Sequence, residues 1–218
     1  MRKTSYVVAF FAVVLTLSLN VISIRRPDWS VDIRISIDML GAKSTVQYGL
    51  TRLCERNVIR FPGGSDGGKV EYSDYKCRPF PARVQDKCED ENRNFCIQWT
   101  TAGYFAELAV GFAAVSCLAL VFGVTTHSRR RRIWRAVAAL VGLHAAALIV
   151  TFALVTDAYS NATLPIFDRA KPSVAYIFGT LAWVLAVLST FGILVTGMAA
   201  SRGHRWAAGN RAYEPIAG

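Results

Sequence analysis

Apolar residues are gathered into long runs along this chain. Four runs are each long enough to cross the roughly 30 Å of hydrocarbon in a bilayer as an α-helix, which rises about 1.5 Å per residue. They occupy residues 6–24, 101–126, 136–156 and 173–200. Polar residues fill the other segments, which are residues 1–5, 25–100, 127–135, 157–172 and 201–218. The pattern predicts four transmembrane helices joined by one long loop and two short ones.

The long polar segment carries a different period. In its first part apolar and polar residues alternate, which is typical of a strand with one buried face. The apolar positions are Val31, Ile33, Ile35 and Ile37. Residues 43–50 form a second candidate strand, and a Gly-rich turn at 62–68 separates residues 54–61 from 70–77 as the arms of a hairpin. We therefore expect an antiparallel sheet of about four strands, followed by an irregular charged loop at 79–94.

Composition also favours a membrane protein. Hydrophobic residues make up 53% of the 218 and charged residues 18%, whereas a soluble domain has about a quarter charged residues. With this many apolar residues, the formal charge of +10 does not indicate nucleic-acid binding. The predicted fold is a membrane all-α fold, a left-handed bundle of four transmembrane helices with a small disulfide-stapled antiparallel sheet in the first extracellular loop.

Basic residues orient the predicted helices. The connection at 127–135 holds five arginines and no acidic residue, which indicates the cytoplasmic side. They are Arg129, Arg130, Arg131, Arg132 and Arg135. Both termini are then cytoplasmic, and residues 25–100 and 157–172 are extracellular. The arginines either anchor the topology alone or also bind anionic lipid of the inner leaflet, at about 1 kcal/mol per basic residue.

Three short motifs bear on processing and sorting. Asn161 begins an Asn-Ala-Thr sequon in the second outer loop, where glycosylation requires an outside location. Tyr213 and Ile216 match a Tyr-x-x-apolar sorting signal in the predicted cytoplasmic tail. The first apolar run alternatively belongs to a cleaved signal peptide, although no small-x-small cleavage site follows it. Cleavage would leave three spans and an outside N-terminus.

Four of the five cysteines fall in the long outer loop, an oxidising location under this topology. Pairing Phe61 with Val70 in the hairpin places Cys54 opposite Cys77, within disulfide reach of an antiparallel pair. This register predicts a Cys54–Cys77 bond and leaves Cys88 to pair with Cys96. The alternative is free or metal-bound thiols, but the spacing matches no zinc pattern, so we predict no metal site.

The order of residues in this loop resembles a known family. Trp29 follows the first span, and Gly49-Leu50 then precedes Cys54 and Cys77. The order is similar to that of the claudin and peripheral-myelin-protein superfamily, whose first outer loop carries Trp, then Gly-Leu-Trp, then two disulfide-bonded cysteines. Four spans, a long first outer loop and a short second one also fit. Departures from the pattern indicate a distant branch, such as the fungal claudin-like proteins: Thr51 at the second Trp, a longer gap between the cysteines, and the additional Cys88 and Cys96.

The resemblance implies a plasma-membrane protein, delivered by the secretory pathway, whose extracellular sheet acts in membrane organisation, cell adhesion or partner assembly. Its partners would be other membrane proteins, bound in cis or in trans. The residues themselves suggest physical roles. Trp29 is either an interfacial anchor or part of the sheet packing, while Gly49 lets the chain approach the helix ends and Leu50 wedges against them.

Two ionisable residues lie within the predicted spans, which makes each a functional candidate. We expect Glu107 to pair with Arg25 or Arg26, or to accept hydrogen bonds from strand backbone, and His144 to bond to a neighbouring helix. Their depths differ by about 9 Å, which argues against direct contact. The alternative function is a channel, a transporter or an auxiliary channel subunit in which the two residues line a polar path. The sequence has no catalytic or cofactor motif, so we expect no enzyme activity and no cofactor.

Small residues recur at three- or four-residue steps in three spans and predict close helix packing. They are Ala102, Ala106, Ala109 and Ala113, then Ala138, Gly142 and Ala146, and finally Gly179, Ala182 and Ala186. A compact monomeric bundle explains these stripes as well as a homo-oligomer does.

Overall fold

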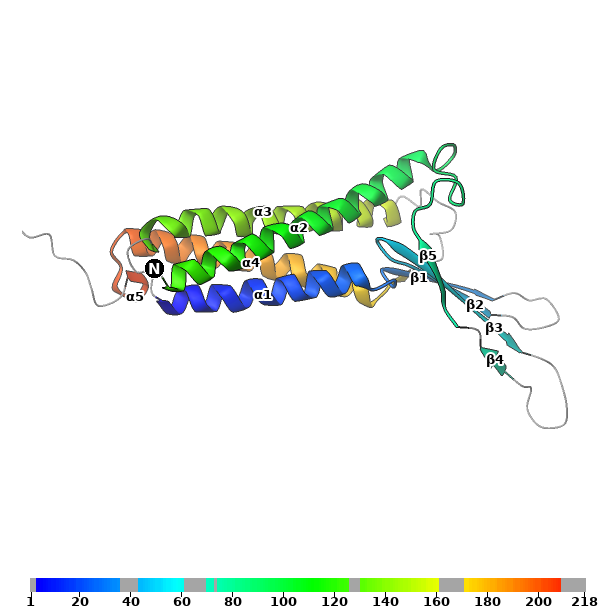
Figure 1. The fold of residues 1–218 in the computed structure, drawn as a ribbon, viewed down its shortest axis with the longest axis horizontal. Coiled ribbons are helices and arrows are strands. Elements are labelled where there is room, and N and C mark those ends of the chain that lie inside the picture. Colours follow the sequence, from blue (N-terminus) through cyan, green and yellow to red (C-terminus); the bar gives the residue numbers. More distant parts are fainter. Residues whose placement is uncertain are drawn as a thin grey trace, which may run out of the picture. The chain divides into compact units, whose positions relative to one another are not determined.

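A computed structural model describes residues 3–35, 43–60, 70–72, 74–125, 130–160 and 171–208 (Figure 1). Four helices are long and apolar enough to cross a membrane, and a small antiparallel sheet with two disulfides accompanies them. The helices are α1 (Lys3–Arg25), α2 (Arg93–Thr125), α3 (Arg130–Ser160) and α4 (Val174–Ser201), followed by the short α5 (Arg205–Ala208). This is the predicted class of fold, a multi-pass membrane protein.

Helices α1, α2 and α3 begin earlier than the apolar runs that predict them, α1 by three residues and the other two by more than one turn. Helix α2 begins at Arg93 rather than Thr101, within the stretch expected to be an irregular loop. Phe95 and Trp99, four residues apart on one face, are both buried, and their packing explains why this first part is helical. Helix α3 begins at Arg130, inside the predicted basic loop, and arginine is a good helix former.

The sheet has the strand order β4-β3-β2-β1-β6, and β5 also pairs with β3. The strands are β1 (Ser30–Ile35), β2 (Lys43–Tyr48), β3 (Arg52–Arg60), β4 (Val70–Tyr72), β5 (Lys76–Pro79) and β6 (Lys171–Pro172). All pairs are antiparallel. The strands predicted from alternation and from the hairpin are present. Strand β6, two residues long and part of the connection between α3 and α4, was not predicted.

The hairpin register differs from the predicted one near the turn. Val70 pairs with Arg60 rather than Phe61. Further along, the chain between Tyr72 and Lys76 holds one residue more than the facing chain between Glu55 and Val58. This extra residue shifts the register by one, as a bulge does. Cys54 and Cys77 therefore still face each other, although the Phe61–Val70 pairing from which we predicted this is wrong.

The buried face of β1 is the opposite of the predicted one where the structure describes it. Ser30 and Asp32 are buried, and Val31 between them is only half buried. Their partners across the ladder, Tyr48 and Val46, are buried as well. The buried face of β1 is therefore polar at the start of the strand. The alternation of apolar residues had predicted an apolar buried face.

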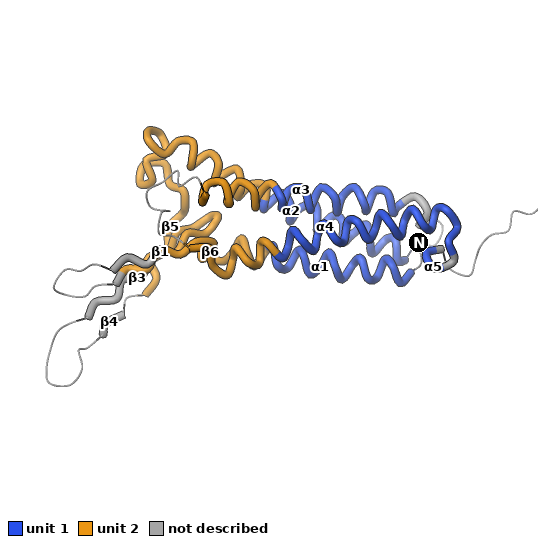
Figure 2. The backbone as a smooth tube through the Cα atoms, turned by 180° about the vertical axis from the view of Figure 1, so that it is seen from behind, with its two compact units in different colours: residues 1–20, 106–149, 181–218 blue, residues 21–105, 150–180 orange. Residues whose placement is uncertain are grey.

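The chain divides into two compact units (Figure 2). Unit 1 comprises residues 1–20, 106–149 and 181–218, and unit 2 comprises residues 21–105 and 150–180. The core of unit 1 consists of buried side chains from all four long helices: Tyr6, Ala9, Val13, Ala113, Leu120, Val137, Ala138, Val141 and Ile193. Unit 2 contains the sheet, both disulfides and the adjoining helix ends.

The predicted small-residue stripes are buried in two helices of three. All four alanines of the α2 stripe, and Gly179, Ala182 and Ala186 of α4, are buried. For α3 the prediction of a buried small-residue stripe is wrong, because Gly142 is half buried and Ala146 is exposed. The buried face of α3 instead includes Ala138, Val141 and Ala145, so it mixes small side chains with a larger one.

Candidate functional site

The candidate site is the part of unit 2 that holds the signature residues Trp29, Gly49, Leu50, Cys54 and Cys77. The first four are buried, with at most 3% of Trp29, Leu50 and Cys54 exposed. Cys77 is exposed on β5. The signature residues therefore lie on the chain that leaves α1, in the turn between β2 and β3, and on the paired strands β3 and β5.

Gly49 is held by backbone on several sides. Its N–H donates to the carbonyl of Arg52 at 2.9 Å, which closes the turn between β2 and β3. A Cβ placed on Gly49 would lie 2.8 Å from the Cα of Pro27 and 3.0 Å from the carbonyl oxygen of Arg26. The segment after α1 and the β2–β3 turn approach each other this closely only because residue 49 has no side chain, as predicted.

An indole from α2 completes this turn. The Nε1–H of Trp99 donates to the carbonyl of Gly49 at 3.1 Å, and Trp99 is 1% exposed. Its ring stacks on Phe95 and meets Phe80 edge-on, and Phe80 in turn meets Tyr48 of β2. This aromatic cluster connects the start of α2 to the sheet. Trp99 is therefore a core residue and not a member of an interfacial aromatic belt, whereas Tyr104 is 69% exposed.

Trp29 is a packing residue. Its Nε1–H donates to the carbonyl of Ser23 at 2.8 Å, and its ring lies edge-on to Tyr176 of α4. Gly179 leaves room for this ring, because a Cβ there would lie 2.9 Å from the indole. Trp29 is therefore buried as a packing role requires, but its side chain contacts residues of α1 and α4, whereas the prediction was packing of the sheet.

The chain around Trp29 also caps helix α4. The first amides of a helix have no partner within it. Here the N–H of Ser173 donates to the carbonyl of Trp29 at 3.1 Å, and that of Ala175 donates to the carbonyl of Asp28 at 3.3 Å. Asp28 is itself held by a two-pronged ion pair with Arg26, with both distances 2.8 Å, which raises the pKa of the Arg26 guanidinium through the hydrogen bond and the carboxylate charge.

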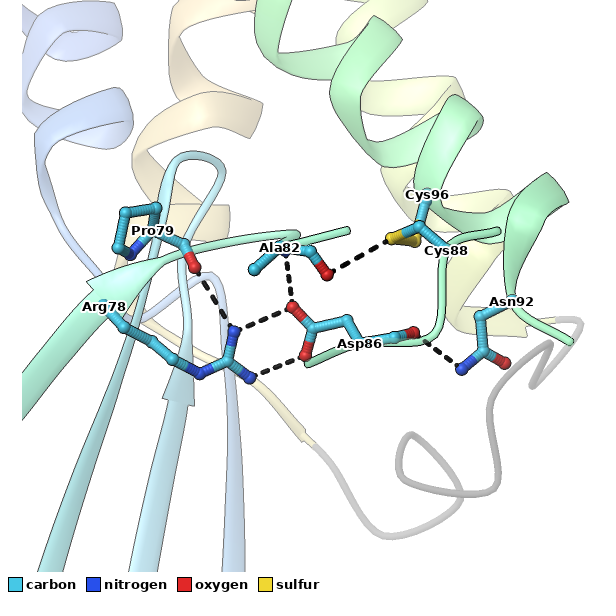
Figure 3. The surroundings of a disulfide bond; sticks show 7 residues. All are labelled: Arg78, Pro79, Ala82, Asp86, Cys88, Asn92 and Cys96. Carbon is cyan, nitrogen blue, oxygen red and sulfur yellow. Dashed lines mark hydrogen bonds and ion pairs between the residues drawn. A yellow bond between two sulfur atoms is a disulfide. The ribbon is translucent and has the colours of Figure 1, made fainter. Parts of the chain in front are cut away.

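The two disulfides are the predicted ones, Cys54–Cys77 and Cys88–Cys96. The first joins facing positions of β3 and β5. The second ties the loop before α2 to the first turns of that helix, as Figure 3 shows. The sulfur of Cys88 lies 3.7 Å from the carbonyl oxygen of Ala82, a packing contact because a disulfide sulfur has no proton to donate.

An ion pair beside the second disulfide organises this loop (Figure 3). The Arg78 guanidinium makes two bonds to the Asp86 carboxylate, at 2.7 and 2.6 Å, and the same carboxylate accepts the N–H of Ala82. Asn92 donates to the backbone carbonyl of Asp86. Partial burial alone would raise the pKa of Asp86, but the bonds from Arg78 and Ala82 and the Arg78 charge outweigh it and hold that pKa below its usual value. Sequence reasoning missed this pair, because eight residues separate its members.

His144 is fully buried in unit 1 and joins three helices. Its Nδ1 lies 2.9 Å from the carbonyl oxygen of Ala109 on α2, so Nδ1 carries a proton and donates. Its Nε2 lies 3.2 Å from the hydroxyl of Thr16 on α1. The predicted bond to a neighbouring helix is present, and a second helix is bound as well.

Glu107 does not have the predicted role. Its side chain is exposed on α2, and Arg26 pairs with Asp28 instead. His144, with its ring enclosed, does not meet Glu107, as predicted from their depths. The two candidate intramembrane residues are therefore not brought together.

Several other predicted sites fall outside the described residues. Asn161, Tyr213, Ile216 and Arg129 are among them, and the side chains of Arg130, Arg131 and Arg132 are too. Arg135 is exposed, with its guanidinium 5.7 Å from the centre of the Trp134 ring. Over the described part of the chain, no three His, Cys, Asp or Glu side chains gather as metal ligands. A cavity of about 10 Å³, close to the size of one water molecule, lies in unit 2 beside Trp29, Trp99 and Tyr176.

These features define a multi-pass membrane protein whose disulfide-linked sheet packs on aromatic and glycine residues at the ends of its helices. No protein-family model matches the chain, and no curated protein sequence matches it. The resemblance to claudins accordingly stays a prediction from the order of residues in the sequence.

Proposed function

We propose that this chain is a claudin-like protein of the plasma membrane that acts through its extracellular sheet in membrane organisation, cell-surface contact or partner assembly. The observation that carries the proposal is the packing of Gly49, whose carbonyl accepts the Trp99 indole and whose Cα lies against the chain after α1. Gly49, Trp99 and the nearby Cys54–Cys77 bond thus have one joint role, which is to fix the sheet on the helix ends.

The sheet offers exposed polar groups on this fixed base. Arg52 and Glu55 of β3 and Lys76 of β5 are exposed, and Tyr75 is 42% exposed beneath the guanidinium of Arg56. Aromatic rings and arginines are enriched in protein interfaces, and other charged groups fit the polar rim of an interface. A rigid support lowers the entropy lost when such a surface binds.

A channel or transport role has less support. His144 is enclosed by helix packing and hydrogen-bonded at both ring nitrogens, while Glu107 is exposed on α2. A polar path built on both residues would require both side chains on one lining.

The first test asks whether the disulfide supports delivery to the cell surface. We expect Cys54→Ser to reduce the amount labelled by a membrane-impermeant biotin reagent to a small fraction of wild type. The matched control is Cys117→Ser, which alters the unpaired cysteine of α2. Equal surface labelling of both variants would contradict the structural role of the bond.

The second test asks whether the sheet carries the interaction. Charge reversal at exposed positions, as Arg52→Glu with Lys76→Glu, is expected to leave surface delivery unchanged and to lower stability by at most about 1 kcal/mol, since Lys76→Glu places a carboxylate opposite Glu55. Capture of neighbours from intact cells by an impermeant crosslinker should fall, and so should adhesion between cells that express the chain. If both readouts match wild type while the protein is at the surface, the proposal is refuted.

A further inference from the structure

One charged side chain on the helices is unexplained by the packing within the chain. Glu107 is the only Asp, Glu, Lys or Arg in the four predicted spans. Its side chain is exposed, and none of the residues that the structure describes holds its carboxylate by a hydrogen bond or ion pair. A carboxylate facing hydrocarbon is strongly disfavoured. A partner group at the lipid-facing surface would remove this cost.

The depth of Glu107 restricts where that partner lies. Glu107 is six residues beyond Thr101, where the apolar run of α2 begins, or about 9 Å along the helix. Tyr104, exposed three residues earlier, is of the type that marks the boundary between headgroups and hydrocarbon. Glu107 thus lies shallowly within the hydrocarbon, on the side where the apolar run begins.

The surroundings of Glu107 on α2 suit the approach of another helix. We call this surface the Glu107 face, made of Glu107, Leu108, Gly111, Ala114 and Val115, all exposed. A Cβ on Gly111 would meet nothing within 4 Å. Gly111 and Ala114 are the small residues of this face and follow Glu107 at four and seven positions, so they lie on the same side of α2. Small residues in this arrangement let a second backbone come close in lipid.

Charge decides which helix fits. Two copies of this chain in one membrane are parallel, and a twofold axis through the Glu107 face would set two Glu107 carboxylates against each other. Like charges there would repel in a medium of low dielectric constant. A helix bearing Lys or Arg at the same shallow level would instead neutralise the charge.

We propose that the Glu107 face binds a transmembrane helix of a different membrane protein, which carries a lysine or arginine opposite Glu107. This interaction lies on the helices and does not depend on the extracellular sheet. It makes the chain a partner in cis, within one membrane, and its failure would leave the proposed role of the sheet untouched.

Site-specific photocrosslinking tests the proposal in the membranes where the protein naturally occurs. A benzophenone amino acid is placed at Val115 on the Glu107 face, and the control is the same residue at Phe191, which is 67% exposed on α4. We expect the Val115 position, and not the control, to capture a transmembrane peptide that contains Lys or Arg. Glu107→Gln should lower the yield by about three- to thirtyfold, the range measured for single intramembrane polar interactions.

A charge exchange completes the test. Glu107→Lys should abolish capture, and Glu in place of the partner's basic residue should restore it. Circular dichroism and size-exclusion elution of each variant show that its fold is intact. Capture of a second copy of this chain, capture of lipid alone, or a yield unchanged by Glu107→Gln would each overturn the proposal. The sheet variants Arg52→Glu and Lys76→Glu should leave this crosslink intact.

Discussion

Replacing Gly49 by alanine tests the packing on which the sheet depends. The new methyl group would lie 2.8 Å from the Cα of Pro27 and 3.0 Å from the carbonyl oxygens of Arg26 and Arg52. All three are backbone atoms, so no change of rotamer relieves the overlap. Overpacking of this kind costs about 1 to 3 kcal/mol. If the turn moves away, the bond from Trp99 is lost as well, at about 1 kcal/mol.

The sum, about 2 to 4 kcal/mol, corresponds to a decrease in Tm of about 4 to 16 °C for a chain of this length. Thermal unfolding of purified protein in detergent, followed by circular dichroism, measures it. The matched control is Gly192→Ala on α4, where an added Cβ meets nothing within 4 Å and alanine is the better helix former. A Tm for Gly49→Ala equal to that of wild type would show that the close packing around Gly49 does not contribute to stability.

Two further predictions concern single interactions. Asp86→Asn should reduce the loss of stability in acid. The pKa of Asp86 is lowered in the folded state, so its charge stabilises that state above the ordinary carboxyl pKa of about 3.9. This contribution disappears as the pH falls through the lowered pKa. Measured from pH 7 to pH 2, a Tm profile identical to wild type would be the contrary result. His144→Leu should lower stability by about 1 to 2 kcal/mol, because it removes the bonds that join three helices. Unfolding in detergent tests this, and an unchanged Tm would mean that the His144 bonds contribute nothing.

Much of the fold follows from the length and periodicity of the apolar runs. Segments of about 20 apolar residues must be helical in lipid, because backbone groups there have no other partners. Helix ends are less predictable, since α2 and α3 extend into polar sequence where burial of Phe95 and Trp99, or helix propensity near Arg130, decides the structure. Hydropathy measures neither effect.

The site was predicted in part, because some of its constraints are local and others are not. Gly49 before a buried Leu50 indicates a close approach, and the alternation of the hairpin brings Cys54 near Cys77. The bulge that shifts the register depends on how two strands pair, which no single segment reveals. Likewise, Trp99 bonds to a carbonyl 50 positions away in the chain, and no sequence pattern specifies that partner.

The proposal requires that the sheet lies outside the cell, and this can be tested directly with two epitopes. An epitope inserted between Gly64 and Ser65, in the Gly-rich stretch, and a second epitope after Gly218 are stained in intact and in permeabilised cells. We expect the first epitope to be stained in intact cells and the second to be stained only after permeabilisation. Staining of the first epitope only in permeabilised cells would contradict it.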